Sequence, residues 1–302
     1  MKLPVMFVWI SWMGSVRAEE PTPPVVVPSE YRHAEMKAQL FGKGATAFWL
    51  YEPASPKVKH APLVIFLHGY SAISPDCYLG WIEHIVRRGS VVVYPKYQKD
   101  LFTLPADYSA NTATAVADAL KILEEQGRTK VDLSRVAVVG HSAGGVGAMN
   151  YAVNAEAVSL PVPKVVMAVH PGQGPRKGWK VIPLDDCTQI PASTHVVIMI
   201  GADDGFVGNH AARRIWSGSS HLLERALITV HSDHHGSPAL SANHLAPLAY
   251  DEHSTDVLDW LGYWRTFDSL CDAVFAGEKW EVVTDMGAWS DGKPFKPLKV
   301  QR

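Results

Sequence analysis

The chain has 302 residues, of which 47% are hydrophobic and 19% are charged. This length and composition fit one α/β domain of roughly 250 residues with extensions, with enough apolar side chains for a large core. The formal net charge of −2 excludes a global positive field that would draw the protein to nucleic acid or to an anionic membrane.

The first residues have the pattern of a secretory signal. Lys2 precedes an apolar stretch, and small residues end at Ala18. We predict a signal peptide over residues 1–18, a secreted or periplasmic protein, and no stable membrane insertion after cleavage, because the stretch is too short to span a bilayer. A retained N-terminal anchor is the alternative. Residues 19–35 are predicted as a Pro-rich linker, residues 36–280 as the folded domain and residues 281–302 as a C-terminal tail.

Short, continuous, β-branched runs alternate with helical patterns along the domain. Runs of this kind are typical of buried parallel strands, so we predict an α/β fold whose mostly parallel central sheet has helices on both faces. The predicted strands are 46–51, 63–67, 90–94, 135–139, 164–169, 196–200 and 225–230, and the predicted helices are 78–88, 107–126, one after residue 145, 209–216 and 255–275. Ligands bind such sheets outside the carboxyl ends of the strands, so the residues directly after each strand carry the functional argument.

The most informative of these strand ends is Gly140-His141-Ser142-Ala143-Gly144. Gly-x-Ser-x-Gly between a strand and a helix holds a serine on a strained turn with its hydroxyl available, so Ser142 is the candidate nucleophile. Gly140 and Gly144 are needed because a Cβ at either position would collide with the neighbouring strand or helix. His141 is expected to pack beside the turn rather than to do chemistry.

A second strand ends in His68-Gly69-Tyr70. The glycine lets the main chain turn, so that the backbone N–H of Tyr70, paired with that of Ala143, forms a candidate oxyanion site. Backbone donors suit this task because they are fixed before charge develops on the substrate. The Tyr70 ring is also a candidate wall for the substrate.

The remaining two parts of a triad come after the last strands. Asp203 and Asp204 both follow the strand at 196–200, and either carboxylate could orient a histidine. The final strand is followed by His231, His234 and His235, of which His235, before Gly236, is the best candidate for the general base and His234 is second.

The histidines also raise the question of a metal. His231, His234, His235, His244 and His253 could offer ligands, but their spacing matches no compact zinc pattern, so we predict no metal and no cofactor. Cys77, Cys187 and Cys271 form an odd set. At most one intramolecular disulfide can form among them, and three reduced thiols are the alternative.

The order Ser142, Asp204, His235 on an alternating β/α chain resembles the α/β-hydrolase superfamily, in particular secreted esterases similar to dienelactone hydrolases, chlorophyllases and polyester hydrolases. In these families a G-Y turn supplies one oxyanion donor and G-x-x-D-x-x-V supplies the acid. The resemblance therefore implies Tyr70 with Ala143 as donors, Asp204 as the acid and His235 as the base. The usual cysteine nucleophile of dienelactone hydrolases is replaced here by Ser142, so that substrate is not implied.

Superfamily members often carry a lid where this chain has residues 171–193, a short Pro/Gly-rich segment without a helical period. We therefore predict no large cap domain, and name Trp179 in this segment as a candidate substrate-binding aromatic. The predicted function is a serine hydrolase that cleaves a small or polymeric carboxylic ester. Amide or peptide hydrolysis by the same triad is one alternative, and a non-catalytic binding protein on the same fold is the other.

Overall fold

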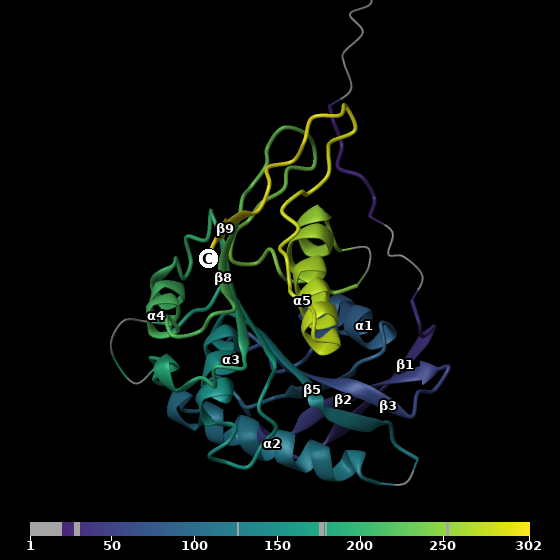
Figure 1. Ribbon diagram of the computed structural model, residues 1–302, viewed down its shortest axis with the longest axis vertical. Helices are drawn as coiled ribbons and strands as arrows, with labels where there is room; N and C mark the ends of the chain where they lie inside the picture. The colour runs from purple at the N-terminus through teal and green to yellow at the C-terminus, as the bar shows by residue number, and fades with distance from the viewer. Residues whose placement is uncertain (1–19, 27–30, 126, 175–177, 179, 252–253) are drawn as a thin grey trace, which may run out of the picture.

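A nine-stranded sheet forms the centre of the protein in the computed structural model, which describes residues 20–26, 31–125, 127–174, 178, 180–251 and 254–302 (Figure 1). The strands are β1 (Glu35–Phe41), β2 (Phe48–Ser55), β3 (His60–Leu67), β4 (Val91–Pro95), β5 (Lys130–His141), β6 (Val165–Val169), β7 (His195–Gly201), β8 (Arg225–Val230) and β9 (Lys299–Gln301). Their order across the sheet is β1-β2-β4-β3-β5-β6-β7-β8-β9.

The six strands from β4 to β8 in this order are parallel, whereas β1, β2 and β9 pair antiparallel at the two sides. β4 and β6 are buried at every position. Strands covered on both faces have no polar alternation, which is why the sequence shows them as continuous apolar runs. The predicted mostly parallel α/β sheet is confirmed.

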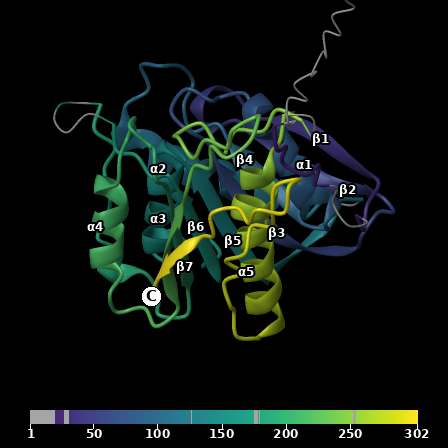
Figure 2. The same ribbon diagram turned by 90° about the horizontal axis from the view of Figure 1, so that it is seen from above.

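Helices cover both faces of the sheet, and Figure 2 shows α1 and α5 on one side with α2, α3 and α4 on the other. Their bounds are α1 (Leu79–Arg87), α2 (Tyr108–Leu123), α3 (Ala143–Asn154), α4 (His210–Gly218) and α5 (Arg265–Ala276), and a π-helical segment, η5 (Leu258–Trp264), leads into α5. Two apolar cores result. One packs α1 and α5 around Trp81, Trp264 and Phe267, and the other packs α2, α3 and α4 against the opposite face.

Short 3₁₀ turns complete the secondary structure: η1 (Gly44–Thr46), η2 (Asp76–Tyr78), η3 (Pro105–Asp107) and η4 (Cys187–Gln189). Only η4 is helical in the described part of the segment between β6 and β7, and no large cap domain is built there.

The two ends of the domain contain strands that the sequence pattern does not reveal. β1 begins at the end of the predicted linker, and β9 pairs with β8 from within the predicted tail and forms the edge of the sheet. Most of β1 is exposed, so it lacks the apolar periodicity of a core strand. The tail also contacts the chain's beginning, because Thr22 and Ser290 exchange hydrogen bonds of 3.0 and 2.9 Å. The predicted signal peptide lies outside the described residues.

All three cysteines are unpaired. Cys187 and Cys271 are buried, and burial raises the pKa of the Cys187 thiol to about 11. Among the helices that the structure describes, none combines the length and apolarity needed to cross a membrane.

Candidate active site

Ser142 lies on the sharp turn between β5 and α3, with φ 57° and ψ −118°. A non-glycine residue rarely adopts positive φ, so its surroundings must hold it there. A Cβ at Gly140 would lie 2.1 Å from the Gly144 carbonyl oxygen, and a Cβ at Gly144 would lie 2.0 Å from that of Leu67. Both distances are far below van der Waals contact, which confirms the steric reason inferred for the two glycines.

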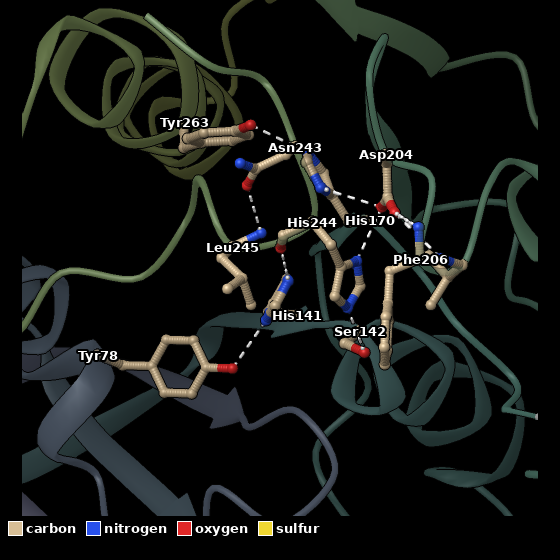
Figure 3. A network of polar contacts seen from close by, with 11 residues as sticks. Tyr78, His141, Ser142, His170, Asp204, Phe206, Asn243, His244, Leu245 and Tyr263 are labelled. Atoms are coloured by element: carbon tan, nitrogen blue, oxygen red, sulfur yellow. Dashed lines mark hydrogen bonds and ion pairs between the residues drawn. The ribbon is translucent and has the colours of Figure 1, made fainter. Parts of the chain in front are cut away.

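The imidazole of His244 lies between Ser142 and Asp204 (Figure 3). Its Nε2 is 2.9 Å from Ser142 Oγ and its Nδ1 is 2.8 Å from Asp204 Oδ2. The other carboxylate oxygen, Oδ1, accepts the backbone N–H groups of Phe206 and Val207 at 3.1 and 3.0 Å. All three side chains are buried, and the exposed Phe206 ring stacks on His244 with ring centroids 5.1 Å apart. This arrangement allows a proton to pass from serine to a carboxylate-supported imidazole.

The structure corrects the expectation of His235 as the base. His235 Nε2 bonds to Asp291 Oδ2 in the C-terminal segment at 2.7 Å, so this ring does not reach Ser142. The reason is the path of the chain after β8. Asp233 and Leu240 pair in an antiparallel bridge, so the histidine run lies on a loop that folds back on itself. The chain returns to the site only near Ala242, whose carbonyl oxygen accepts the Asp203 N–H at 3.2 Å, and His244 follows.

His234 and Asp203, the second candidates for the base and the acid, also lie away from the serine. His234 is exposed on the same loop as His235. Asp203 is exposed beside the buried Asp204, so only the second acid of the pair contacts the imidazole. The structure therefore brings together Ser142 and Asp204 of the predicted triad and adds His244.

The two predicted oxyanion donors flank the serine. Ala143 follows it directly, and Tyr70 follows Gly69, where an added Cβ would lie 3.4 Å from Ser142 Cβ. Within the part of the chain that the structure describes, no acceptor contacts the backbone N–H of Tyr70 or Ala143. Two unpaired N–H groups beside a serine can stabilise charge on a substrate oxygen.

Of the two aromatic residues predicted to contact the substrate, the structure describes only Tyr70. Tyr70 is 41% exposed, and its hydroxyl donates to the Leu101 carbonyl at 2.8 Å. It therefore lies at the surface beside the candidate oxyanion site. Trp179 lies outside the described residues.

The Asp204 carboxylate is stabilised as an anion. Burial by itself raises its pKa, but the imidazoles of His170 and His244 and the Val207 N–H outweigh burial and hold the pKa of Asp204 well below its usual range. The acid is therefore ionised at neutral pH, as an orienting carboxylate must be.

Two further histidines, His141 and His170, are fully buried around the triad. Burial lowers the pKa of both, and each also lies near other imidazoles that disfavour its charge. His141 bonds to the Tyr78 hydroxyl and the His244 carbonyl, and His170 bonds to the Tyr263 hydroxyl. Both rings are therefore neutral, and they shape the site through hydrogen bonds instead of charge.

His141, His170 and His244 are also close enough for one nitrogen of each to approach a shared ion. The donor set does not favour a metal, however. Both ring nitrogens of His141 and of His244 already have hydrogen-bond partners, and the Tyr263 hydroxyl occupies Nε2 of His170. An ion would have to displace the contacts that place the base against the serine.

The roles of three residues at the site were missed from the sequence, where His244 was considered only as a possible metal ligand. His244 sits in an irregular segment with no local motif, and Tyr78 belongs to a helix start whose pattern is typical of the core. His170 did carry a signal, because it directly follows β6, where the strand-end rule directs attention.

The sheet order, the serine turn between β5 and α3 and the residues gathered at the strand ends define an α/β hydrolase. A family model described as Chlorophyllase matches residues 50–209, more than half of the chain. The chain therefore belongs to the chlorophyllase family, a family of the α/β-hydrolase superfamily, and it is a hydrolase of that type. The match covers Ser142 and Asp204 and ends before His244. No curated protein matches the chain.

Proposed function

We propose that the protein hydrolyses carboxylic esters with Ser142 as nucleophile, His244 as general base and Asp204 as the orienting acid. One observation carries the proposal: Nε2 of His244 lies 2.9 Å from Ser142 Oγ while its Nδ1 lies 2.8 Å from Asp204 Oδ2. The first distance is within reach for direct proton transfer, and the second fixes the tautomer that leaves Nε2 free to accept.

The reaction has two halves. Ser142 Oγ attacks the ester carbonyl carbon as His244 Nε2 takes the serine proton, and the N–H groups of Tyr70 and Ala143 bind the resulting oxyanion. The tetrahedral intermediate collapses, the C–O bond to the alcohol breaks, and His244 returns the proton to the departing alcohol. Water, activated by His244, then attacks the acyl-enzyme and releases the acid and Ser142.

An apolar portion of the substrate has room beside Ala143, the residue after the serine. A cavity of about 330 Å³ lies between α2 and α3, and Ala143, Leu67 and Tyr97 are among its lining residues. Ala143 also supplies a candidate oxyanion donor, so an ester bound there can place an apolar group in this cavity. Small or polymeric esters with such a group are the proposed substrates, and the N-terminal signal pattern supports a secreted or periplasmic location.

The test is Ser142→Ala assayed on p-nitrophenyl acetate, butyrate and octanoate, with p-nitroanilides of the same acids for comparison. Loss of the nucleophile should lower kcat by about a million-fold. The native protein should also prefer each ester to its matched anilide and should label with a fluorophosphonate. Serine-independent turnover would refute the mechanism, a preference for anilides would favour amidase activity, and an unlabelled, inactive native protein would favour a non-catalytic binding role.

A further inference from the structure

A chain of buried hydrogen bonds connects the turn at Gly69, the serine turn and the segment that carries His244. Figure 3 shows its Tyr78, His141 and His244 part. The backbone N–H of Gly69 donates to the Tyr78 hydroxyl at 2.9 Å, and this hydroxyl lies 2.8 Å from His141 Nδ1. On the other side of the ring, His141 Nε2 lies 2.9 Å from the backbone carbonyl oxygen of His244. Tyr78 and His141 are 1% and 3% exposed, so water does not compete for these bonds.

The proton positions in this chain follow from its two ends. The His244 carbonyl can only accept, so His141 Nε2 carries the proton. Burial lowers the pKa of His141, which keeps the ring neutral and leaves Nδ1 as an acceptor. Burial also raises the pKa of Tyr78, so its hydroxyl keeps a proton and donates it to Nδ1. The same hydroxyl accepts the Gly69 N–H through a lone pair, so the donor and the acceptor of every bond in the chain are defined.

The two ends of this hydrogen-bond chain lie next to the proposed oxyanion donor and the proposed base. Gly69 precedes Tyr70, a proposed oxyanion donor, and the His244 carbonyl belongs to the residue that carries the proposed base. His141 itself precedes Ser142 in the chain. The segment that carries His244 is irregular, and individual hydrogen bonds hold it in place of a strand or helix ladder. Ala242 is held by Asp203 and Ser232, and the bond from His141 is the one to the backbone of His244 itself.

We propose that Tyr78 and His141 form a clamp that holds the base-bearing segment and the oxyanion turn at fixed positions around Ser142. Both are positioning residues, since neither touches the reacting atoms, and the inference rests on the proposed esterase function. The clamp transfers no proton to the substrate. Its effect is geometric: a displacement of about 1 Å at a reacting group can cost about 100-fold in rate.

Single-atom and near-isosteric substitutions test the clamp. Tyr78→Phe removes only the hydroxyl, and His141→Asn removes the Nε2 donor. Each should lower kcat on p-nitrophenyl butyrate by about 10- to 100-fold with KM changed by less than about twofold. His141→Gln places an amide N–H near the position of Nε2 and should restore most of kcat. The matched control is Tyr94→Phe, which removes a hydroxyl from a buried neighbour that donates to the Ala72 carbonyl instead.

The double variant Tyr78→Phe/His141→Asn gives the sharper readout. If the two residues act as one unit, the kcat of the double variant should equal that of the less active single variant. The second substitution then has no further effect, because the first has already broken the chain of hydrogen bonds. Losses that multiply would overturn the clamp, as would a kcat within about twofold of native in folded Tyr78→Phe. If Tyr78→Phe does not fold by circular dichroism, equal kcat values for His141→Gln and His141→Asn overturn the proposal, and rescue by glutamine alone supports it.

Failure of the clamp is distinguishable from failure of the proposed function. A native protein that loses its esterase activity in Ser142→Ala, but not in any clamp variant, keeps the function and rejects the clamp. A native protein whose turnover survives Ser142→Ala rejects the function, and with it the clamp.

Discussion

Nδ1 of His170 lies 3.4 Å from Oδ2 of Asp204, the same oxygen that bonds to His244. His170 is completely buried at the end of β6 with φ 44°, and the Tyr263 hydroxyl lies 3.0 Å from its other nitrogen. Among the described residues no hydrogen-bond partner meets Nδ1 at normal geometry. Because Asp204 can only accept, this long contact requires the proton on Nδ1, and the Tyr263 hydroxyl then donates to Nε2. The approach also depends on Gly201, where a Cβ would lie 2.7 Å from His170 Cε1. The acid therefore lies between two imidazoles, of which that of His244 also hydrogen-bonds to Ser142.

We expect His170→Gly to lower kcat on p-nitrophenyl butyrate by about tenfold, the rate equivalent of about 1.4 kcal/mol, because Asp204 loses the buried imidazole whose Nδ1 lies 3.4 Å from Oδ2 and favours the ionised carboxylate. His170→Asn should retain most of kcat, since asparagine tolerates positive φ and offers an N–H near the Nδ1 position. The control is His195→Asn, which should leave kcat unchanged. His195 is the first residue of β7, at the end of the strand opposite to Asp204. Equal rates for the glycine and asparagine variants would contradict the role of the donor.

The two candidate bases are separated by paired alanine variants. His244→Ala should lower kcat by about a million-fold, because the serine proton then has no acceptor. His235→Ala should leave kcat within about twofold of native and cost at most about 1 kcal/mol of stability, since its partner Asp291 is exposed. Steady-state rates and fluorophosphonate labelling measure both effects. An inactive, folded His235→Ala beside an active His244→Ala would reverse the assignment.

Acid should destabilise the fold through the buried neutral histidines. Burial lowers the pKa of His141 and His170 in the folded protein, whereas both take up protons near pH 6.5 in the unfolded chain. Below that pH the unfolded state binds more protons, so the free energy of unfolding falls as pH falls, by about 1.4 kcal/mol per unit for each histidine until its folded pKa is reached. Asp204 adds a loss only at lower pH, because its depressed pKa keeps its contribution intact above about pH 4.

Urea unfolding at pH 7.5, 6 and 5 checks this expectation, with His170→Asn as the comparison. The variant should lose stability less steeply, by up to about 1.4 kcal/mol per pH unit, because it has one fewer histidine to protonate on unfolding. Identical slopes for the two proteins between pH 6 and 5 would show that His170 does not contribute.

The serine turn makes a steric prediction. Gly144→Ala should prevent folding or lower the melting temperature by many degrees, because its Cβ would lie 2.0 Å from one backbone carbonyl oxygen and 2.5 Å from the next, and backbone cannot move aside cheaply. Gly205→Ala is the control, since nothing lies within 4 Å of the added carbon. Differential scanning fluorimetry of both variants gives the comparison, and a native-like melting temperature for Gly144→Ala would show that the turn can relax.

The sequence by itself determined the parts of this protein that local chemistry dictates. Buried parallel strands appear as β-branched runs, and the Gly-x-Ser-x-Gly turn identifies Ser142 from steric demands within a few residues. The pair Asp203 and Asp204 follows from its place at a strand end, and the family resemblance selects Asp204 from it. The tertiary structure decided what depends on the path of an irregular chain. The Asp233–Leu240 bridge carries His235 toward the C-terminal segment and returns the chain so that His244 meets Ser142. No periodicity marks such a path, because the contacts that fix it join residues far apart in sequence, and for the same reason His141, His170 and Tyr78 acquire their roles only in the folded protein.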